Sequence, residues 1–237
     1  MVQSEVVQTE VRAVQQQVAT LIGRYPASPA ESSQVDDRLH VGPLSVENHQ
    51  VAQYSAADDN ATAGENGSAG VNRRLRIAPA PPHACAAVIV PQLADGRFGL
   101  VVRYRFAPAK WSLEFPRALS DDDDETWRNT CARVLDDATG WLARDMTLLG
   151  SVQVDPSCMA TRSIVALAQA CTPQRVVGWD PNQMIAGCIA VTSQALDLLI
   201  RRGDVECAAT LSALCLVNLH AAEASGAVPK SHINCGA

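Results

Sequence analysis

A run of acidic side chains, Asp121 to Asp124, is by residue type the part of the sequence best suited to chemistry. Carboxylate oxygens are the ligands that hard cations such as Mg²⁺ take, so the run is a candidate for gathering metal ions. It also suits the start of a helix, because negative charge is favourable at the positive end of the helix dipole. Both interpretations stay open, and a solvated helix entrance is the commoner role of such a run.

The segment that follows is predicted to form the helix that positions these charges. Ser120 and the aspartates can accept hydrogen bonds from the free amides of a helix start, and Asp122 with Glu125 has capping-box spacing. Gly140 supplies the left-handed residue at which helices often end. Apolar residues three and four positions apart form one stripe that should face a core: Trp127, Cys131, Val134, Leu135 and Ala138.

As a whole, residues Leu119 to Trp141 resemble the Nudix box, whose pattern is G-x5-E-x7-R-E-U-x-E-E-x-G-U, with U an aliphatic or aromatic residue. Five residues match at the right spacing, namely Glu125, Arg133, Leu135, Gly140 and Trp141. Asp137 conservatively replaces the second-to-last glutamate. Leu119 stands at the first glycine, and Val134 and Ala138 stand at two glutamates.

The resemblance implies a metal site that this chain has largely lost. In the family, the glutamates at the positions of Val134, Asp137 and Ala138 converge on Mg²⁺ or Mn²⁺, which polarises a diphosphate and activates water. Only Asp137 still carries a side-chain oxygen there. Glu125, Arg133 and Asp137 are therefore catalytic remnants, with Asp137 and Glu125 as weak metal ligands, and we expect Mg²⁺ only if some activity remains. Glu125 and Arg133 also suit a plain surface ion pair.

The chain from about His83 to His220 resembles the ADP-ribose pyrophosphatase branch of this superfamily. Apolar runs on either side of Asp95-Gly96 predict a hairpin. The family's second strand ends near Q-Y-R, where this chain has Arg103-Tyr104-Arg105. Residues Trp111 to Pro116 match the family's W-x-L-E-x-P strand, and Arg117-Ala118-Leu119 replaces the A-G that follows it.

Arg103, Arg105 and Glu114 are the candidate ligand-binding residues, because relatives use their equivalents for substrate or metal contacts. A plain strand-edge role for each is equally ordinary. Leu119 resists the positive φ angle that glycine allows, so the loop before the box should be reshaped. Residues 147–170 and 196–219 resemble the family's later strands and closing helices. Asp180 is a weak substitute for the glutamate that active relatives carry before that closing segment.

Composition limits the classes of function. The chain has 237 residues, of which 47% are hydrophobic, enough for one domain with extensions. A formal charge of −6 argues against a general nucleic-acid binder, whose footprint is a basic face. The compact basic cluster Arg73, Arg74 and Arg76 is interpreted as solvated. No apolar run approaches the roughly 20 residues needed to span a bilayer, so no membrane association is expected.

Cysteine usage points to a reducing compartment. The eight cysteines show no C-x-x-C pair or zinc-finger spacing, and most lie in apolar runs, where cysteine behaves as a small buried hydrophobe. The amino terminus lacks the positive region and apolar core of a secretory signal. A cytoplasmic location, or an equivalent organelle interior, is therefore expected.

Four segments are expected along the chain. Residues 1–25 read as an amphipathic helix with Val7, Val11, Val14, Val18 and Leu21 on one stripe, ending near Gly23. Residues 26–75 read as a linker with weak strands at 39–41 and 50–54 and a flexible stretch at 55–72. A Nudix-like domain should occupy residues 76–224, and a flexible tail residues 225–237.

The expected fold is α/β: a Nudix-type α/β/α sandwich with a mixed, curved sheet, plus an amino-terminal helix and a flexible linker. Fold alone does not give function, and three hypotheses remain. The first is a catalytically impaired or inactive domain retained for binding an ADP-ribose-like nucleotide or for assembly. The second is an active metal-dependent hydrolase of ADP-ribose-like diphosphates. The third is a structural subunit or scaffold, for which a homodimer is the expected assembly.

Overall fold

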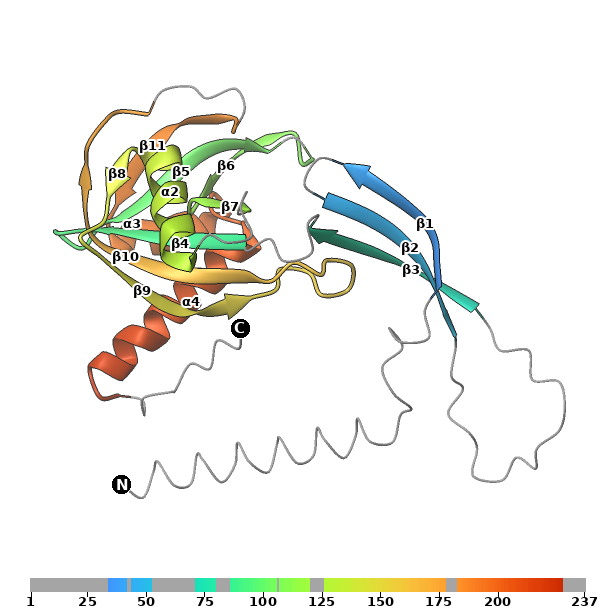
Figure 1. Cartoon of the computed structure of the whole chain (residues 1–237). Coiled ribbons are helices and arrows are strands. Elements are labelled where there is room, and N and C mark those ends of the chain that lie inside the picture. Colours follow the sequence, from blue (N-terminus) through green and yellow to red (C-terminus); the bar gives the residue numbers. More distant parts are fainter. Residues whose placement is uncertain are drawn as a thin grey trace, which may run out of the picture. The chain divides into compact units, whose positions relative to one another are not determined.

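The computed structural model describes residues 34–41, 44–52, 71–79, 86–105, 107–119, 126–177 and 183–227 (Figure 1). The predicted helix at residues 2–23 lies outside the described residues, as does most of the predicted linker. The chain divides into two compact units, Met1–Ile77 and Ala78–Ala237. The predicted domain boundaries remain predictions, and each unit is described by itself below.

The first unit contains a three-stranded sheet in the order β1-β2-β3. Strands β1 (Gln34–Val41) and β2 (Leu44–Ala52) pair antiparallel around a tight connection. Strand β3 covers Val71–Pro79. The sequence predicted weak strands at 39–41 and 50–54, which lie within or overlap β1 and β2. The prediction of a flexible linker up to Asn72 is wrong at its end, because β3 begins at Val71.

One face of this small sheet is organised around Glu47, which is 5% exposed. Its carboxylate accepts a hydrogen bond from Nη1 of Arg76 at 2.9 Å. It also lies 3.0 Å from Nε of Arg38, the residue opposite Glu47 on β1. The side chain of His49 is 2.9 Å away. The hydrogen bond to His49, followed by the contacts with Arg76 and Arg38, lowers the pKa of Glu47. Arg76 is exposed, as its interpretation as solvated expects, but it also pairs with Glu47, because burying that carboxylate requires a cationic partner.

The second unit is built on an eight-stranded mixed sheet with the central order β11-β5-β4-β10-β8. Strands β4 (Ala86–Leu93) and β10 (Ser163–Pro173) pair in parallel at its centre. The hairpin predicted around Asp95-Gly96 joins β4 to β5 (Phe98–Arg105), with Gly96 at φ +84°. The remaining strands are β6 (Lys110–Glu114), β7 (Arg117–Leu119), β8 (Trp141–Leu142), β9 (Asp145–Val152) and β11 (Ile185–Val191).

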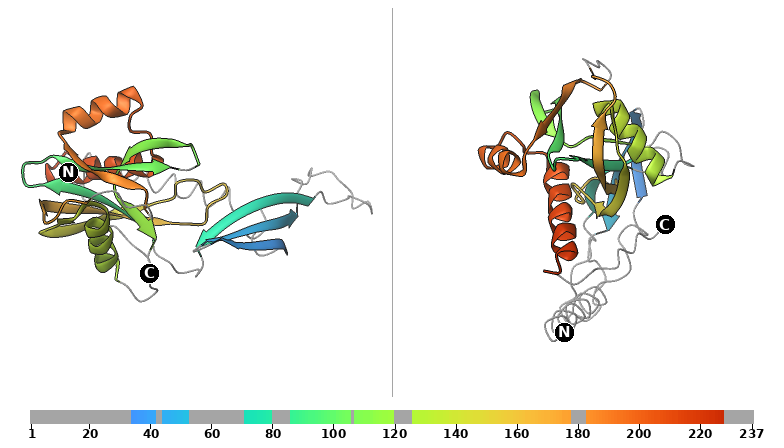
Figure 2. Two further views of the ribbon diagram at one scale, coloured as in Figure 1. Left: turned by 90° about the horizontal axis from the view of Figure 1, so that it is seen from above. Right: turned by 90° about the vertical axis from the view of Figure 1, so that its left-hand side faces the viewer.

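Helices cover both faces of this sheet, as the α/β/α prediction requires (Figures 1 and 2). Because side chains alternate along a strand, β4 sends Val88 and Val90 into one core and Ala87 and Ile89 into the other. Helix α2 (Trp127–Thr139) packs on the second core. Helices α3 (Ser193–Arg202) and α4 (Ala208–Ala224) pack on the first. Strand β4 is buried on both faces, which explains its unbroken apolar sequence.

Helix α2 begins later than its sequence suggested. Thr126 is the N-cap, and its hydroxyl accepts from the amide of Asn129 at 3.3 Å. The predicted capping by Ser120 and Asp122 is therefore wrong; these residues lie outside the described ranges, and the threonine hydroxyl satisfies the free amide instead. The other end is confirmed, because Gly140 has φ +69° and donates to the carbonyl of Asp136 at 2.7 Å. The predicted stripe of Cys131, Val134, Leu135 and Ala138 is buried.

The described cysteines are buried less often than their apolar runs predicted, since Cys158, Cys188 and Cys207 are only half-buried. Cys131 and Cys171 are buried, whereas Cys215 is exposed, contrary to the expectation for its apolar run. Burial raises the pKa of the Cys171 thiol to about 11 and that of Cys188 to about 12. These two thiols therefore stay protonated at neutral pH. Within the described ranges, no helix is both long and apolar enough to cross a bilayer.

The end of helix α2 gives a stability prediction. A Cβ on Gly140 would lie 2.5 Å from the carbonyl oxygen of Arg175, whereas one on Gly96 would meet nothing within 4 Å. Both glycines have positive φ. Gly96→Ala should cost about 1–2 kcal/mol from backbone conformation alone. Gly140→Ala should lose about 1–3 kcal/mol more, because the packed carbonyl must move. Urea unfolding of both variants measures this, and equal losses would contradict the close approach at Gly140.

Candidate functional site

Glu114 is the most deeply buried charged side chain among the described residues, at 1% exposure. It ends strand β6, opposite Val101 of β5. The next residue, Phe115, is fully buried and donates its backbone N–H to the hydroxyl of Thr210 at 3.0 Å. This bond fixes the chain after Glu114 to helix α4. The carboxylate is therefore held in place by the strand before it and the helix beside it.

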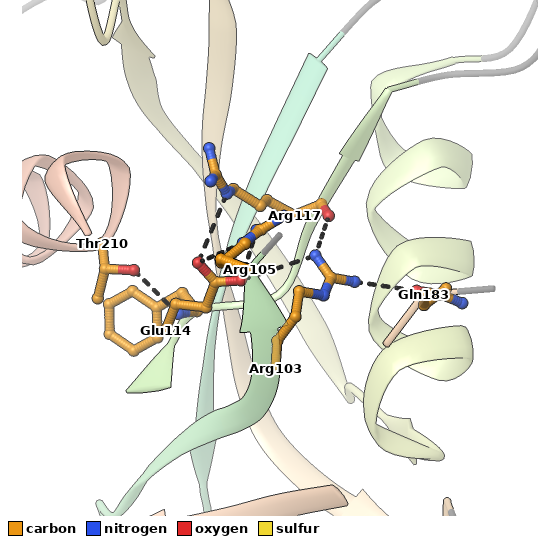
Figure 3. A network of polar contacts seen from close by, with 7 residues as sticks. Arg103, Arg105, Glu114, Arg117, Gln183 and Thr210 are labelled. Carbon is orange, nitrogen blue, oxygen red and sulfur yellow. Dashed lines mark hydrogen bonds and ion pairs between the residues drawn. The ribbon is translucent and has the colours of Figure 1, made fainter. Parts of the chain in front are cut away.

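Three arginine side chains converge on this carboxylate (Figure 3). Arg105 donates to both oxygens, from Nη2 to Oε1 at 2.5 Å and from Nε to Oε2 at 3.3 Å. Nη1 of Arg103 lies 3.7 Å from Oε1, and Nε of Arg117 lies 3.8 Å from Oε2. The last two contacts are ion pairs that are too long to be hydrogen bonds. We call Glu114 and these three residues the arginine cluster.

Arg103 is oriented by two further contacts. Its Nη1 donates to the backbone carbonyl of Arg117 at 3.2 Å, and its Nη2 donates to Oε1 of Gln183 at 3.1 Å. In Figure 3 the Arg117 carbonyl lies above the guanidinium and Gln183 lies to its right. Only 7% of the Arg103 side chain is exposed, against 30% for Arg105 and 34% for Arg117. The cluster thus has a buried centre and a partly open rim.

The charges of the cluster do not balance. Three guanidinium groups face one carboxylate, so two positive charges remain among these four residues. Arginine stays protonated in proteins, so the cluster cannot shed this charge by titration. Taking charge out of water costs several kcal/mol per ion unless an opposite charge compensates it. Glu114 alone therefore does not compensate all three arginines, and Arg103 has further interactions besides those described above.

Helix α2 carries buried apolar side chains at two positions that the Nudix-box resemblance aligns with carboxylates. Val134 is 3% exposed and packs in the core with Cys131 and Leu135. Ala138 is 1% exposed and clusters with Val101 and Ile185. Val101 is the cross-strand partner of Glu114, so Ala138 packs beside the strand pair that holds the cluster. Both positions are filled by closely packed methyl groups.

The acidic residues that remain on α2 pair with arginines at the surface. Asp137 lies 3.8 Å from Arg133, one helical turn away, with 46% of its side chain exposed. Asp136 forms an ion pair with Arg175, with 3.2 Å between its Oδ1 and Nη2 of the arginine. Glu125 and Asp121 to Asp124 lie outside the described residues. Within the described ranges, no three His, Cys, Asp or Glu side chains come together as a metal-binding group.

Two surface hollows of about 250 Å³ lie elsewhere on the second unit. One is lined by Val102, Trp111 and Leu113, which alternate with the cluster residues along β5 and β6 and so lie on the opposite face of that strand pair. The other runs between α2 and β8, with Leu135, Trp141 and Met146 among its lining residues. Neither includes a residue of the arginine cluster.

Comparison with known proteins supports the fold. No family model matches the sequence, and no curated protein matches it. The structure is similar to the crystal structure of an ADP compounds hydrolase, with a TM-score of 0.60 and 21% sequence identity. The match covers 83% of this chain and 97% of that one. The chain therefore has the predicted Nudix-type α/β fold.

The structure brings some predicted site residues together and separates others. Arg103, Arg105 and Glu114 form one cluster, and their role in ligand binding stays a prediction. The remnants Arg133 and Asp137 pair with each other instead. Sequence reasoning missed Arg117 as a member of the cluster and Gln183 as a partner of Arg103. The sequence marked Arg117 only as a departure from the A-G of the family. Its contact with Glu114 depends on β7, which pairs with β4.

The buried carboxylate gives a second prediction. Glu114→Gln keeps the shape of the side chain but removes the carboxylate charge that the three guanidinium groups face. Removing one partner of a buried ion pair costs about 3–5 kcal/mol, so the urea midpoint at pH 7 should fall sharply. Asp95→Asn is the matched control, because Asp95 forms an exposed pair with Arg97. The account is contradicted if the two substitutions shift the midpoint equally.

Proposed function

We propose that this protein is a nucleotide-binding member of the Nudix fold that holds an ADP-ribose-like nucleoside diphosphate without hydrolysing it. The observation that carries this proposal is the packing of helix α2. Val134 and Ala138 occupy two of the box's carboxylate positions, and both are buried in apolar clusters. A divalent cation bound by the box pattern would lose two of its three helix ligands.

The remaining acid on this part of the helix is a poor substitute. Asp137 is half exposed and is paired with Arg133. A hard cation takes several oxygen ligands, and a single paired carboxylate in water supplies one of them. Without the cation, the charge that develops on the diphosphate and on the attacking water has no Lewis acid to stabilise it. Loss of hydrolysis follows from these missing ligands.

The ligand class is supported by two independent features. The fold is similar to that of an ADP compounds hydrolase, and the sequence around residues 83–220 resembles ADP-ribose pyrophosphatases. The arginine cluster supplies positive charge and planar donors, which suit phosphate oxygens. We therefore propose a nucleoside diphosphate as the ligand, bound without being hydrolysed.

Binding without turnover is the third prediction. Isothermal titration of the full chain with ADP-ribose should show saturable binding, and incubation with ADP-ribose and Mg²⁺ should release no AMP above a protein-free blank. The alternative, an active hydrolase that recruits metal through Asp137 and Glu125, predicts Mg²⁺-dependent AMP release. Turnover that disappears in Asp137→Asn would establish that alternative and overturn ours.

Assembly is a second candidate role, supported by the sheet of the first unit. Leu39 lies opposite Val46, on the face away from the Arg38 and Glu47 pair. Leu75 precedes Arg76, whose side chain contacts Glu47, so alternation places Leu75 on that same apolar face. Leu39 is 62% exposed and Leu75 is 50% exposed. We propose that this face forms the contact of a homodimer, because burying it removes apolar area from water.

The dimer proposal gives the fourth prediction. Light scattering after size exclusion should give twice the chain mass for the native protein and a single chain mass for Leu39→Glu with Leu75→Glu. Leu142→Glu is the matched control, because Leu142 is 60% exposed on β8 and should leave the mass unchanged. Deletion of residues 1–25 tests the predicted amino-terminal helix as the other contact. A dimer that survives the double substitution but not the deletion would assign the interface to that helix.

A further inference from the structure

One of the two surface hollows, about 250 Å³ in volume, lies on the face of the β5–β6 strand pair opposite Glu114. The strand pair forms one wall, and the connection between α3 and α4 forms the other. The walls include Val102, Trp111 and Leu113 on the first side and Gly203, Asp204 and Glu206 on the second. Pockets that bury drug-sized ligands measure roughly 300–1,000 Å³, so this hollow suits a smaller group such as one side chain.

The first wall offers an aromatic ring. Trp111 is 52% exposed, and it pairs across the strands with Tyr104. The two rings meet edge to face, with 5.5 Å between their centroids and 73° between their planes, and this contact restrains the orientation of the indole. Half-buried Val102 and Leu113 add apolar surface on the same face of the strands.

The second wall is tied to the end of helix α3. Gly203 closes the helix with φ +79°. The backbone N–H groups of Asp204 and Val205 donate to the carbonyl of Leu199, at 2.9 and 3.4 Å. Val205 is 1% exposed and anchors the connection in the core. The exposed side chain of Asp204 therefore stands on a backbone that is fixed on both sides.

The charges that line the hollow leave one carboxylate unbalanced. Lys110 and Glu206 form an ion pair between the two walls. Among the described residues, none forms an ion pair with Asp204, so the lining carries one more negative charge than positive. Arg201 and Arg202 end helix α3, where they suit the negative end of its dipole, and neither lines the hollow.

An aromatic ring and an unbalanced carboxylate in one hollow select an organic cation, and a guanidinium group suits them better than an ammonium group. A guanidinium is planar, so it can stack on an indole while its N–H donors pair with a carboxylate. The protein makes the stacking contact elsewhere, because Cζ of Arg128 lies 4.8 Å from the centroid of the Trp127 ring. An alkyl chain behind the group would cover Val102 and Leu113.

We propose that this hollow binds an arginine side chain of a partner protein, with Trp111 stacked on its guanidinium group and Asp204 paired with it. The size of the hollow fits one side chain, and tryptophan and arginine are enriched among the hot spots of protein interfaces. The inference does not rest on the proposed function, because Arg103, Arg105 and Glu114 lie on the other face of the strand pair.

The test is titration of the ¹⁵N-labelled full chain with the capped peptide acetyl-Gly-Arg-Gly-amide, followed by nuclear magnetic resonance. The chain has four tryptophans, so the Trp111 indole N–H signal is identified as the one missing from the spectrum of Trp111→Phe. We expect this signal and the backbone N–H signal of Gly203 to shift saturably. The same peptide with norleucine in place of arginine keeps an alkyl chain without the charge, and it should shift neither signal.

Two substitutions test the walls separately. Asp204→Asn, read from the Trp111 signal, and Trp111→Leu, read from the Gly203 signal, should each weaken binding roughly fivefold. Asp197→Asn is the matched control, because Asp197 is exposed on α3 outside the hollow and should leave the dissociation constant unchanged. The spread of the backbone signals of each variant shows that it is folded.

Four results would overturn the inference. The first is the absence of a saturable shift at both Trp111 and Gly203. The second is equal weakening by Asp204→Asn and Asp197→Asn, because the peptide would then follow overall charge. The third is an equal response to the norleucine peptide. The fourth is tighter binding of butylguanidinium than of the peptide, because a peptide backbone would then hinder entry and a partner protein could not supply the group.

Discussion

The burial of one carboxylate, Glu114, constrains the structure around it more than any other described interaction. An unpaired charge at 1% exposure would be too costly to keep, so the fold must bring cations to it. Arg105 comes from the paired strand β5, and Arg117 comes from β7, three residues further along the chain. The chain between Glu114 and Arg117 is held by Thr210 of α4, whose hydroxyl accepts from the backbone N–H of Phe115. The strand segment that carries the buried charge is thus tied to the helix behind it.

Helix α2, next to this strand pair, is apolar at Val134 and Ala138 and is buried there. A helix that presents three carboxylates keeps that surface wet and open to a cation, whereas one that presents Val134 and Ala138 can pack against the sheet. Ala138 does so on Val101 and Ile185, and Val134 does so in the core of Cys131 and Leu135. The proposed loss of hydrolysis rests on this packing, because neither side chain offers an oxygen to a cation.

Local patterns predicted most of the fold but little of the charge network. The Asp95-Gly96 turn, the apolar stripe of α2 and the glycine at residue 140 are short-range signals, and the structure confirms them. The N-cap at Thr126 was missed, because the acidic run offered a stronger capping pattern than one threonine. Strand β3 and the pairing of Arg76 with Glu47 were missed because they depend on residues 29 positions apart. Arg117 and Gln183 join Arg103 from 14 and 80 positions away, a distance that no local pattern reports.

The central proposal is that the protein binds an ADP-ribose-like nucleoside diphosphate without holding the divalent cation that hydrolysis needs. Titration of Mn²⁺ followed by electron paramagnetic resonance tests it most directly, because free Mn²⁺ gives a signal that bound Mn²⁺ loses. Adding the protein to Mn²⁺ and ADP-ribose should leave the free signal no lower than ADP-ribose alone does. A further loss of one Mn²⁺ per chain, abolished by Asp137→Asn, would contradict the claim.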